Sequence, residues 1–215
     1  MQKAAMQKGD IERKRLAEGL ILAGVDEVGR GCLAGPVVTA CVVLDYTKLA
    51  ALDEKTRSKI RDSKTLSAKQ RDELLGLIAD ISVDLAVGVA TARDIEDVGI
   101  LKATFLAMNR AIAGISKIKP DLILVDGNQS IQGQIIKQQT IVKGDSLCFS
   151  IAAASIIAKE HRDQYMREQA AVHSHWGFER HVGYGTAQHI AAIHSHGICH
   201  LHRKNFAPIR EMNFP

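Results

Sequence analysis

Residues 20–44 read LILAGVDEVGRGCLAGPVVTACVVL, two apolar runs joined by a glycine-rich turn, and this stretch decides the fold. Residues 37–44 are largely β-branched and apolar on both faces, which is typical of a strand buried in the centre of a sheet. Residues 20–25 predict a second, shorter strand, and the acidic pair Asp26 and Glu27 follows it directly. The stretch therefore predicts two strands with charged groups at the turn between them.

The apolar pattern further along the chain predicts strands that alternate with helices. We expect strands over residues 83–90, 122–125 and 139–142, and helices over residues 67–81, 92–115, 150–171 and 186–195, the second of them broken near Gly99. This order predicts an α/β fold with a mixed central sheet flanked by helices and a helical C-terminal part. Residues 1–18 are polar and predict an N-terminal leader, either loose or a short surface helix, and residues 19–215 are predicted to form the main domain.

The composition suits a globular protein, with 46% hydrophobic and 24% charged residues in a chain of 215. The N-terminal segment has no apolar core of a signal peptide, and no apolar run approaches the roughly 20 residues that a membrane helix needs. We therefore expect a soluble, cytoplasmic protein. The four cysteines form no C-x-x-C pair and are expected to be reduced thiols. A net charge of +4 permits a polyanionic partner without requiring one.

Four carboxylates share one placement relative to the predicted strands. Asp26, Glu27 and Asp126 follow apolar strands, and Asp145 lies between a strand and a helix. Ligands of open α/β sheets gather at such strand ends, and oxygen ligands favour Mg²⁺ or Mn²⁺ over Zn²⁺. One such acid alone is equally well explained as a turn former, but four favour a metal site. Because successive strand residues point to opposite faces, Asp26 and Glu27 reach one site only if the strand ends or twists there.

The turn after the acidic pair carries the pattern G-x-G-x-x-x-G at Gly29, Gly31 and Gly35. Taken alone, this pattern is a weak signal for dinucleotide binding. The acidic neighbours and the strand predicted after the turn, where a helix is required, argue against that interpretation. Glycines here instead allow a sugar–phosphate chain to approach the backbone closely, and Arg30 is placed to contact a phosphate.

Further candidates for substrate contacts are two lysines and a tyrosine. Lys64 and Lys143 lie near the ends of predicted elements, where a phosphate can dock, although ordinary surface lysines explain them equally well. Tyr184 lies in a glycine turn before a helix, where it either stacks on a sugar or base or packs into the core.

All nine histidines lie between His161 and His202. Their spacing around Cys199 matches no common zinc site, so zinc is the weaker interpretation. We expect His202, Arg203 and Lys204 to form a patch that faces phosphate.

Together these motifs resemble those of bacterial ribonuclease HII. The resemblance extends over about residues 20–210 and is specific because the motifs match in type and order, at residues 26–31 with 35–38, 62–64 with 66–67, 125–127, 143–145, 152–156, 181–186, and 202–203 with 206–208. One departure is Val182, where lysine is frequent in such enzymes, and this position lacks the phosphate contact that a lysine would supply.

The resemblance implies a ribonuclease H-like fold and a metal-dependent endonuclease. Such an enzyme cuts the RNA strand of RNA–DNA hybrids and incises duplex DNA 5′ of embedded ribonucleotides, leaving 5′-phosphate and 3′-hydroxyl ends. The resemblance implies that two divalent ions, Mn²⁺ or Mg²⁺, are held by Asp26, Glu27, Asp126 and Asp145. It also implies that Gly29, Arg30 and Gly31, with Tyr184, recognise the 2′-hydroxyl and the junction with DNA.

Three other functions remain open on the residues. The first is a non-catalytic protein that binds hybrids, and the second is a nucleotide-cofactor enzyme, which requires a helix over residues 37–44. The third is a nuclease or resolvase of the same fold that acts on DNA. No protein partner is indicated, and we expect a monomer.

Overall fold

A mixed five-stranded sheet with the strand order β3-β2-β1-β4-β5 forms the centre of the molecule. The computed structural model describes residues 7–60 and 68–212. The strands are β1 (Leu22–Val28), β2 (Val37–Leu44), β3 (Ser82–Ala90), β4 (Leu122–Asp126) and β5 (Lys137–Ile141). β1, β2 and β3 pair antiparallel, whereas β4 pairs parallel to both β1 and β5. The predicted α/β fold with a mixed sheet is confirmed.

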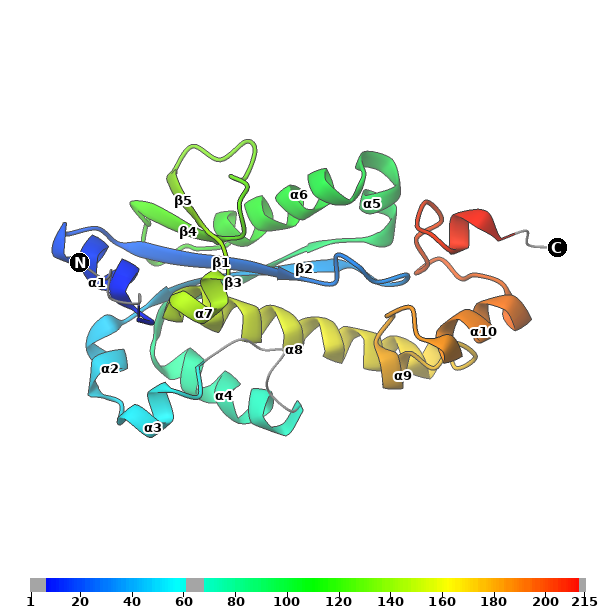
Figure 1. Cartoon of the computed structure of the whole chain (residues 1–215), viewed down its shortest axis with the longest axis horizontal. Coiled ribbons are helices and arrows are strands. Elements are labelled where there is room, and N and C mark those ends of the chain that lie inside the picture. The colour runs from blue at the N-terminus through cyan, green and yellow to red at the C-terminus, as the bar shows by residue number, and fades with distance from the viewer. Residues whose placement is uncertain (1–6, 61–67, 213–215) are drawn as a thin grey trace, which may run out of the picture.

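Two long helices cover the two faces of this sheet (Figure 1). Helix α6 (Ile100–Ala113) packs on one face, against side chains of β1, β2 and β4. Helix α8 (Phe149–Val172) packs on the other, and its alanines lie against alternate residues of β2. A Cβ atom at Gly24 would lie 2.2 Å from the carbonyl carbon of Ser150, so this glycine lets α8 touch the backbone of β1.

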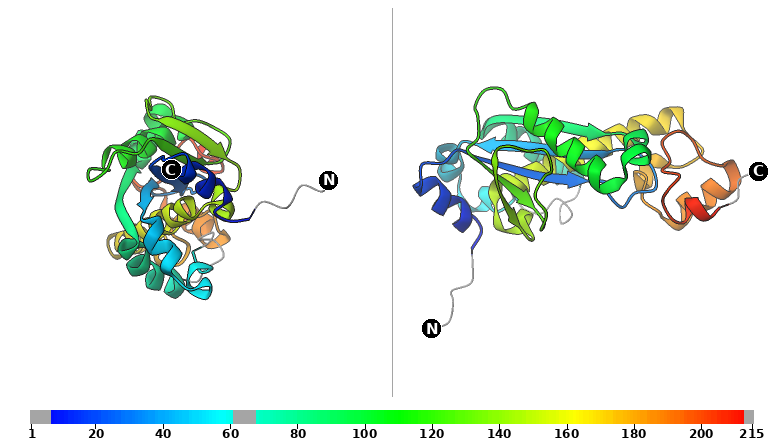
Figure 2. Two further views of the ribbon diagram at one scale, coloured as in Figure 1. Left: turned by 90° about the vertical axis from the view of Figure 1, so that its left-hand side faces the viewer. Right: turned by 90° about the horizontal axis from the view of Figure 1, so that it is seen from above.

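Shorter helices surround these layers. They are α1 (Asp10–Ala17), α2 (Tyr46–Ala51), α3 (Glu54–Arg57), α4 (Ala68–Asp80), α5 (Ala92–Val98), α7 (Gly144–Leu147), α9 (Phe178–His181), α10 (Ala187–His196) and a 3₁₀ helix (Ile209–Glu211). Helices α9 and α10 lie with the C-terminus at one end of the elongated molecule, and α1 lies at the other (Figure 2). The helical C-terminal part is therefore confirmed, and the leader contains a helix.

Most predicted elements agree with the structure. Every residue of β2 is buried, and the predicted break between two helices falls at Gly99. Strand β5 begins two residues earlier than predicted, because this edge strand opens with the polar residues Lys137 and Gln138 and gives no apolar signal. The short helices α7 and α9 were not predicted. Ser67, the first residue of the helix predicted over residues 67–81, lies outside the described residues.

The four cysteines are free thiols, with Cys32, Cys41 and Cys148 buried and Cys199 half-buried, as predicted. Within the described ranges, none of the helices combines the length and the apolar character needed to cross a membrane.

Candidate active site

Asp26 and Asp126 lie side by side on the neighbouring parallel strands β1 and β4. The strands pair Val25 with Val125, so the next residue of each strand points to the face that α8 covers. Asp126 Oδ1 accepts a 2.7 Å hydrogen bond from the backbone N–H of Gly144. The two strands and the covering helix thus bring the buried Asp26 and the half-buried Asp126 together.

Glu27 belongs to the same strand but faces the other side of the sheet. β1 continues to Val28, so the acidic pair lies within the strand, and the prediction that it follows the end of the strand is wrong. In the antiparallel register Glu27 lies opposite Thr39, whereas Asp26 lies opposite Ala40. The Glu27 carboxylate accepts a 3.1 Å hydrogen bond from Arg30 Nη1. Glu27 nevertheless remains near enough to influence Asp26 electrostatically.

The surroundings of Asp26 disfavour its negative charge. Burial raises the pKa of Asp26 well above its ordinary value, and the nearby charges of Glu27 and Asp126 raise it further. Hydrogen bonds from the side chain of Ser155, on α8, and from the backbone N–H of Glu27 oppose this rise. Within residues 7–60 and 68–212, no three acidic, histidine or cysteine side chains already converge as a metal-binding group. The donor set still fits a hard divalent cation, because all its ligands are carboxylate oxygens whose mutual repulsion such an ion removes.

Asp145 lies on α7, directly after the residue that binds Asp126. Its side chain is buried, with 7% exposed. Lys143 adopts a left-handed backbone conformation (φ 58°) and turns the chain from β5 into α7. The hydrogen bond from Gly144 to Asp126 therefore ties the start of α7, with Asp145 and the adjacent Lys143, to the end of β4.

Two buried arginines hold the glycine-rich turn between β1 and β2. Arg203 donates hydrogen bonds to the carbonyl oxygens of Gly29 (2.7 Å), Arg30 (2.9 Å) and Gly35 (2.8 and 3.0 Å). Arg162, on α8, donates to the carbonyl oxygens of residues 34, 36 and 182. The two guanidinium groups therefore fix the backbone of the turn from the interior of the protein.

The predicted phosphate-facing patch at the C-terminus is wrong for two of its three residues. Arg203 is fully buried and His202 is 1% exposed, so neither side chain lies at the surface. Lys204 alone is exposed. The physical reason is that backbone carbonyls, which sequence does not reveal, satisfy the Arg203 guanidinium in the interior.

The glycine turn and Tyr184 form one surface. Tyr184 is 41% exposed, hydrogen-bonds to Cys32 of the turn and has Lys159 Nζ 5.6 Å from its ring centroid. The backbone N–H of Leu33 donates a 2.9 Å hydrogen bond to the carbonyl of Gly183, beside Tyr184. A Cβ at Gly31 would meet no atom within 4 Å, so the space above this glycine is open. Tyr184 therefore lies beside the turn that carries Gly29, Arg30 and Gly31.

The other predicted contact residue, Lys64, lies outside the described residues. Sequence reasoning missed Ser155 and the roles of Arg162 and Arg203. Ser155 lies in residues 152–156, one of the stretches that carried the resemblance, but no role was predicted for it.

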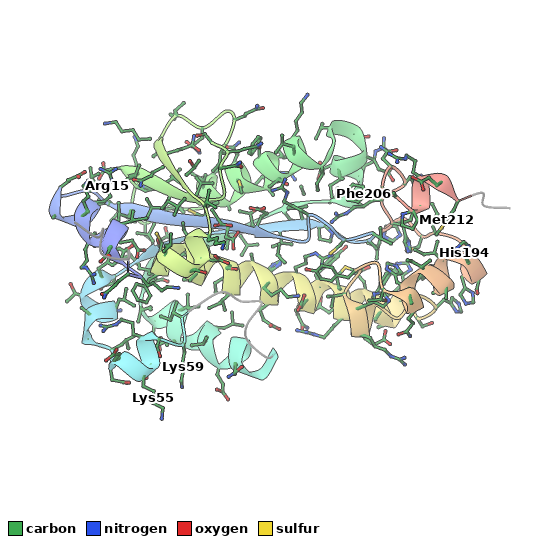
Figure 3. The ribbon with its side chains drawn as sticks, in the orientation of Figure 1. Arg15, Lys55, Lys59, His194, Phe206 and Met212 are labelled. Atoms are coloured by element: carbon green, nitrogen blue, oxygen red, sulfur yellow. The ribbon has the colours of Figure 1, made fainter. Side chains whose placement is uncertain are left out.

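The buried histidines pack against one another near the C-terminal end, where Figure 3 labels His194 and Phe206. His189 Nε2 lies 3.1 Å from His202 Nε2, and the rings of His181 and His189 stack with centroids 4.3 Å apart. Burial is the largest cause that lowers the pKa of both His189 and His202 to about 4. These imidazoles are therefore neutral packing groups at neutral pH.

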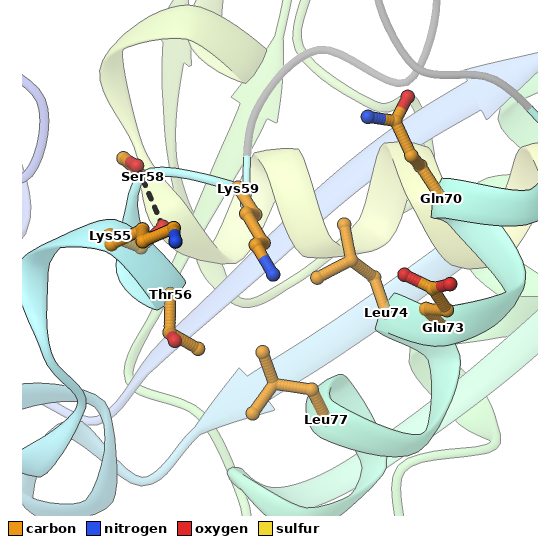
Figure 4. Close-up of a pocket in the computed structure, with 8 residues that line it drawn as sticks. All are labelled: Lys55, Thr56, Ser58, Lys59, Gln70, Glu73, Leu74 and Leu77. Carbon is orange, nitrogen blue, oxygen red and sulfur yellow. Dashed lines mark hydrogen bonds between the residues drawn. The ribbon is translucent and has the colours of Figure 1, made fainter.

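A cavity of about 520 Å³ between α3 and α4 is separate from the acidic residues (Figure 4). It is lined by Lys55, Thr56, Ser58, Lys59, Gln70, Glu73, Leu74 and Leu77. None of the predicted site residues that the structure describes lines it.

A model of the ribonuclease HII family matches residues 23–209. The chain belongs to the ribonuclease HII family. Among its relatives, the ribonuclease HII of Albidiferax ferrireducens is 45% identical over 89% of this chain and 88% of that protein. This membership makes the chain a ribonuclease H, a hydrolase of phosphodiester bonds.

Solved structures of related enzymes share the fold. Ribonuclease H2 of Pyrococcus horikoshii OT3 aligns with a TM-score of 0.73 at 25% identity, covering 88% of this chain and 95% of that one. Bst-RNase HIII in complex with Mn²⁺ aligns with a TM-score of 0.66 at 23% identity, covering 89% of this chain and 68% of that one. The predicted ribonuclease H-like fold is confirmed, and β2 excludes the helix that a dinucleotide-cofactor enzyme requires.

Proposed function

We propose that this ribonuclease H cuts the RNA strand of RNA–DNA hybrids and incises duplex DNA on the 5′ side of an embedded ribonucleotide. The products carry 5′-phosphate and 3′-hydroxyl ends. The observation that carries the proposal is the pair of neighbouring carboxylates, buried Asp26 and half-buried Asp126, together with a glycine turn that has open space above Gly31. Acidic ligands and a surface for a sugar–phosphate chain are what phosphodiester hydrolysis requires.

Asp26, Asp126 and Asp145 would hold two Mn²⁺ or Mg²⁺ ions together with Glu27, whose carboxylate would have to turn away from Arg30 to reach them. Such ions lower the pKa of a water and stabilise the leaving 3′-oxygen. The repulsion that raises the pKa of Asp26 supports this role, and the fold is shared with Bst-RNase HIII, which was solved in complex with Mn²⁺.

The residues of this chain orient the reacting parts. Gly144 fixes the Asp126 carboxylate through its backbone N–H, and Ser155 fixes that of Asp26. The open backbone at Gly31 and the half-exposed ring of Tyr184 are proposed to receive the ribose and to detect its 2′-hydroxyl. Arg30, 49% exposed at its side chain, is placed to contact the neighbouring phosphate. Lys143 and Lys64 are proposed as further phosphate contacts.

The test is cleavage of a labelled DNA duplex with one ribonucleotide, compared with an all-DNA duplex and a full RNA–DNA hybrid. Each is incubated with MgCl₂, MnCl₂ or EDTA. We expect cutting of the ribonucleotide-containing duplex and the hybrid, only with metal, and only 5′ of the ribonucleotide in the former. Equal cutting of the all-DNA duplex would move the function to a DNA nuclease, and binding without cutting would favour a non-catalytic hybrid-binding protein.

Asp126→Asn provides the matched variant for this assay, because it keeps the shape of the side chain and removes its charge. We expect it to lose at least about a hundredfold in kcat, as removing a ligand or its orienting partner does in metal sites. Asp97→Asn, which changes an exposed carboxylate paired only with Arg93 in the described structure, is the control and keeps full activity.

A further inference from the structure

Residues 8–12, the N-terminal strap, contact the segment that carries Asp145. Lys8 Nζ donates a 2.7 Å hydrogen bond to the backbone carbonyl of Asp145. The backbone N–H of Gly9 donates a 2.8 Å hydrogen bond to the carbonyl of Leu147. The two bonds therefore hold α7 along its length, from outside the range that the family model matches.

Glu12, also in the N-terminal strap, caps helix α8 from a distant part of the chain. Its carboxylate is buried, with 1% of the residue exposed, and accepts hydrogen bonds from the backbone N–H groups of Phe149 (2.8 Å) and Ser150 (2.9 Å). It also accepts from Ser150 Oγ (2.7 Å) and from the hydroxyl of Tyr46 (2.9 Å). The N-cap residue of α8, Cys148, makes no side-chain cap. A carboxylate at this position satisfies the first N–H groups and interacts favourably with the helix dipole.

The strap packs closely against Phe149 and also borders a cavity. A Cβ at Gly9 would lie 3.0 Å from the Phe149 ring, and Lys8 Nζ lies 5.3 Å from the centroid of that ring. Beside these contacts lies a cavity of about 580 Å³ that Glu12 and Leu16 help to line. The polar contacts of Lys8 and Glu12 therefore decide where the strap sits.

We propose that Lys8 and Glu12 are positioning residues for the acidic site. They fix α7, which carries Asp145, and the start of α8, which carries Ser155 against Asp26. This inference rests on the proposed function, because it takes Asp145 as a ligand of the divalent ions. Residues that orient metal ligands typically contribute tenfold to a hundredfold to metal affinity or activity.

The experiment measures how far the thermal unfolding temperature rises with MnCl₂ concentration, together with kcat and KM for hybrid cleavage, in the full-length chain. Lys8→Met and Glu12→Gln are compared with the wild type, with Asp145→Asn, and with the double variant Lys8→Met/Asp145→Asn. Lys14→Met and Glu18→Gln, which change exposed residues of α1 and its C-cap outside the strap, are the controls. Lys8→Arg tests rescue by another donor, and Lys8→Met decides the matter if Glu12→Gln fails to fold.

We expect that Lys8→Met and Glu12→Gln each require about ten times more MnCl₂ to give the same rise in unfolding temperature as the wild type. We also expect each variant to lower kcat about tenfold and to change KM less than twofold. We expect Lys8→Arg to restore both values, and Lys8→Met to add nothing once Asp145 is replaced, because the two residues act as a unit. A wild-type response to MnCl₂ in both strap variants would overturn the inference, as would effects of Lys8→Met and Asp145→Asn that multiply. A wild-type response in Asp145→Asn would overturn it together with the role proposed for Asp145.

Discussion

Asp26 shows how a single residue can act against the stability of the fold that holds it. Its carboxylate is buried between β1 and α8, and Glu27 and Asp126 add their negative charges to the cost of burial. A hydrophobic or neutral residue would fit this position better on physical grounds. Residues that break a local rule in this way gather at functional sites, so the conflict itself supports a role in catalysis.

We expect Asp26→Asn to be inactive and, in EDTA, more stable than the wild type. A carboxyl group whose pKa rises on folding costs stability at every pH above its ordinary pKa, and the amide carries no charge. Calorimetry at pH 7.5 should show an unfolding temperature several degrees higher. An unfolding temperature equal to or below that of the wild type would contradict this account, and Asp97→Asn controls for loss of an exposed carboxylate.

The C-terminal segment and the glycine turn are one structural element held together by Arg203. Its guanidinium is the donor for carbonyl groups of Gly29, Arg30 and Gly35, and Ala34 forms a single β-bridge with His202. The end of the chain therefore builds the surface that is proposed to meet the substrate.

We expect Arg203→Met to destabilise the protein by several kcal/mol, because each buried carbonyl left without a donor costs about 1–3 kcal/mol. Arg203→Lys should recover only part of this loss, since an ammonium group cannot reproduce the planar fork of donors. Urea unfolding measures the effect, and Arg210→Met, at an exposed arginine, is the matched control. Equal stability of the two methionine variants would refute the role of Arg203.

The buried histidine pair predicts a loss of stability in mild acid. The folded pKa of His189 and of His202 is about 4, below the ordinary value of 6.5, so folding favours the neutral rings. Their contribution is complete above pH 6.5 and is lost as the pH falls from 6.5 toward 4. The free energy of unfolding in urea should fall across this window, and His202→Gln should flatten the decline. His194→Gln, at an exposed residue of α10, should leave its slope unchanged.

How well the sequence predicted each helix or strand depends on how much of that element is buried. Strand β2 is predictable because burial on both faces demands an apolar run, whereas β5 is half-exposed and begins with Lys137 and Gln138. Helix α7 has four residues and thus no periodicity to detect. The sequence placed the acidic residues after strands, whereas Asp26 and Glu27 lie within β1 and Asp126 is the last residue of β4, because a strand can continue beyond its apolar run. Arg203 was predicted at the surface because a charged side chain is usually exposed, and the sequence does not reveal the backbone carbonyl groups that bind it in the interior.

At the scale of the whole molecule, an excess of positive charge accompanies a site rich in carboxylates. The formal charge is +4, so long-range attraction for a nucleic acid must overcome the local repulsion around Asp26. Attraction of this kind acts through released counterions and weakens with salt.

We expect binding of the Asp126→Asn variant to an RNA–DNA hybrid to weaken linearly in a plot of log affinity against log KCl. Replacing Arg30 by methionine in that background should reduce the slope by about 1, because one phosphate contact is lost. Fluorescence anisotropy in EDTA measures this. Arg93→Met, which removes an exposed charge on α5, should not change the slope, and an equal change in both variants would argue against a specific contact at Arg30.

The parallel pairing of β1 with β4 also has a consequence for how the enzyme is made. Asp26 is synthesised before Asp126, and roughly 100 residues must follow before β4 can pair with β1, so this pairing is non-local. Helix α7, which carries Asp145, comes later still. A nascent chain released after β3 therefore carries Asp26 and Glu27 without Asp126 and Asp145, and the acidic site stays incomplete until α7 has been made.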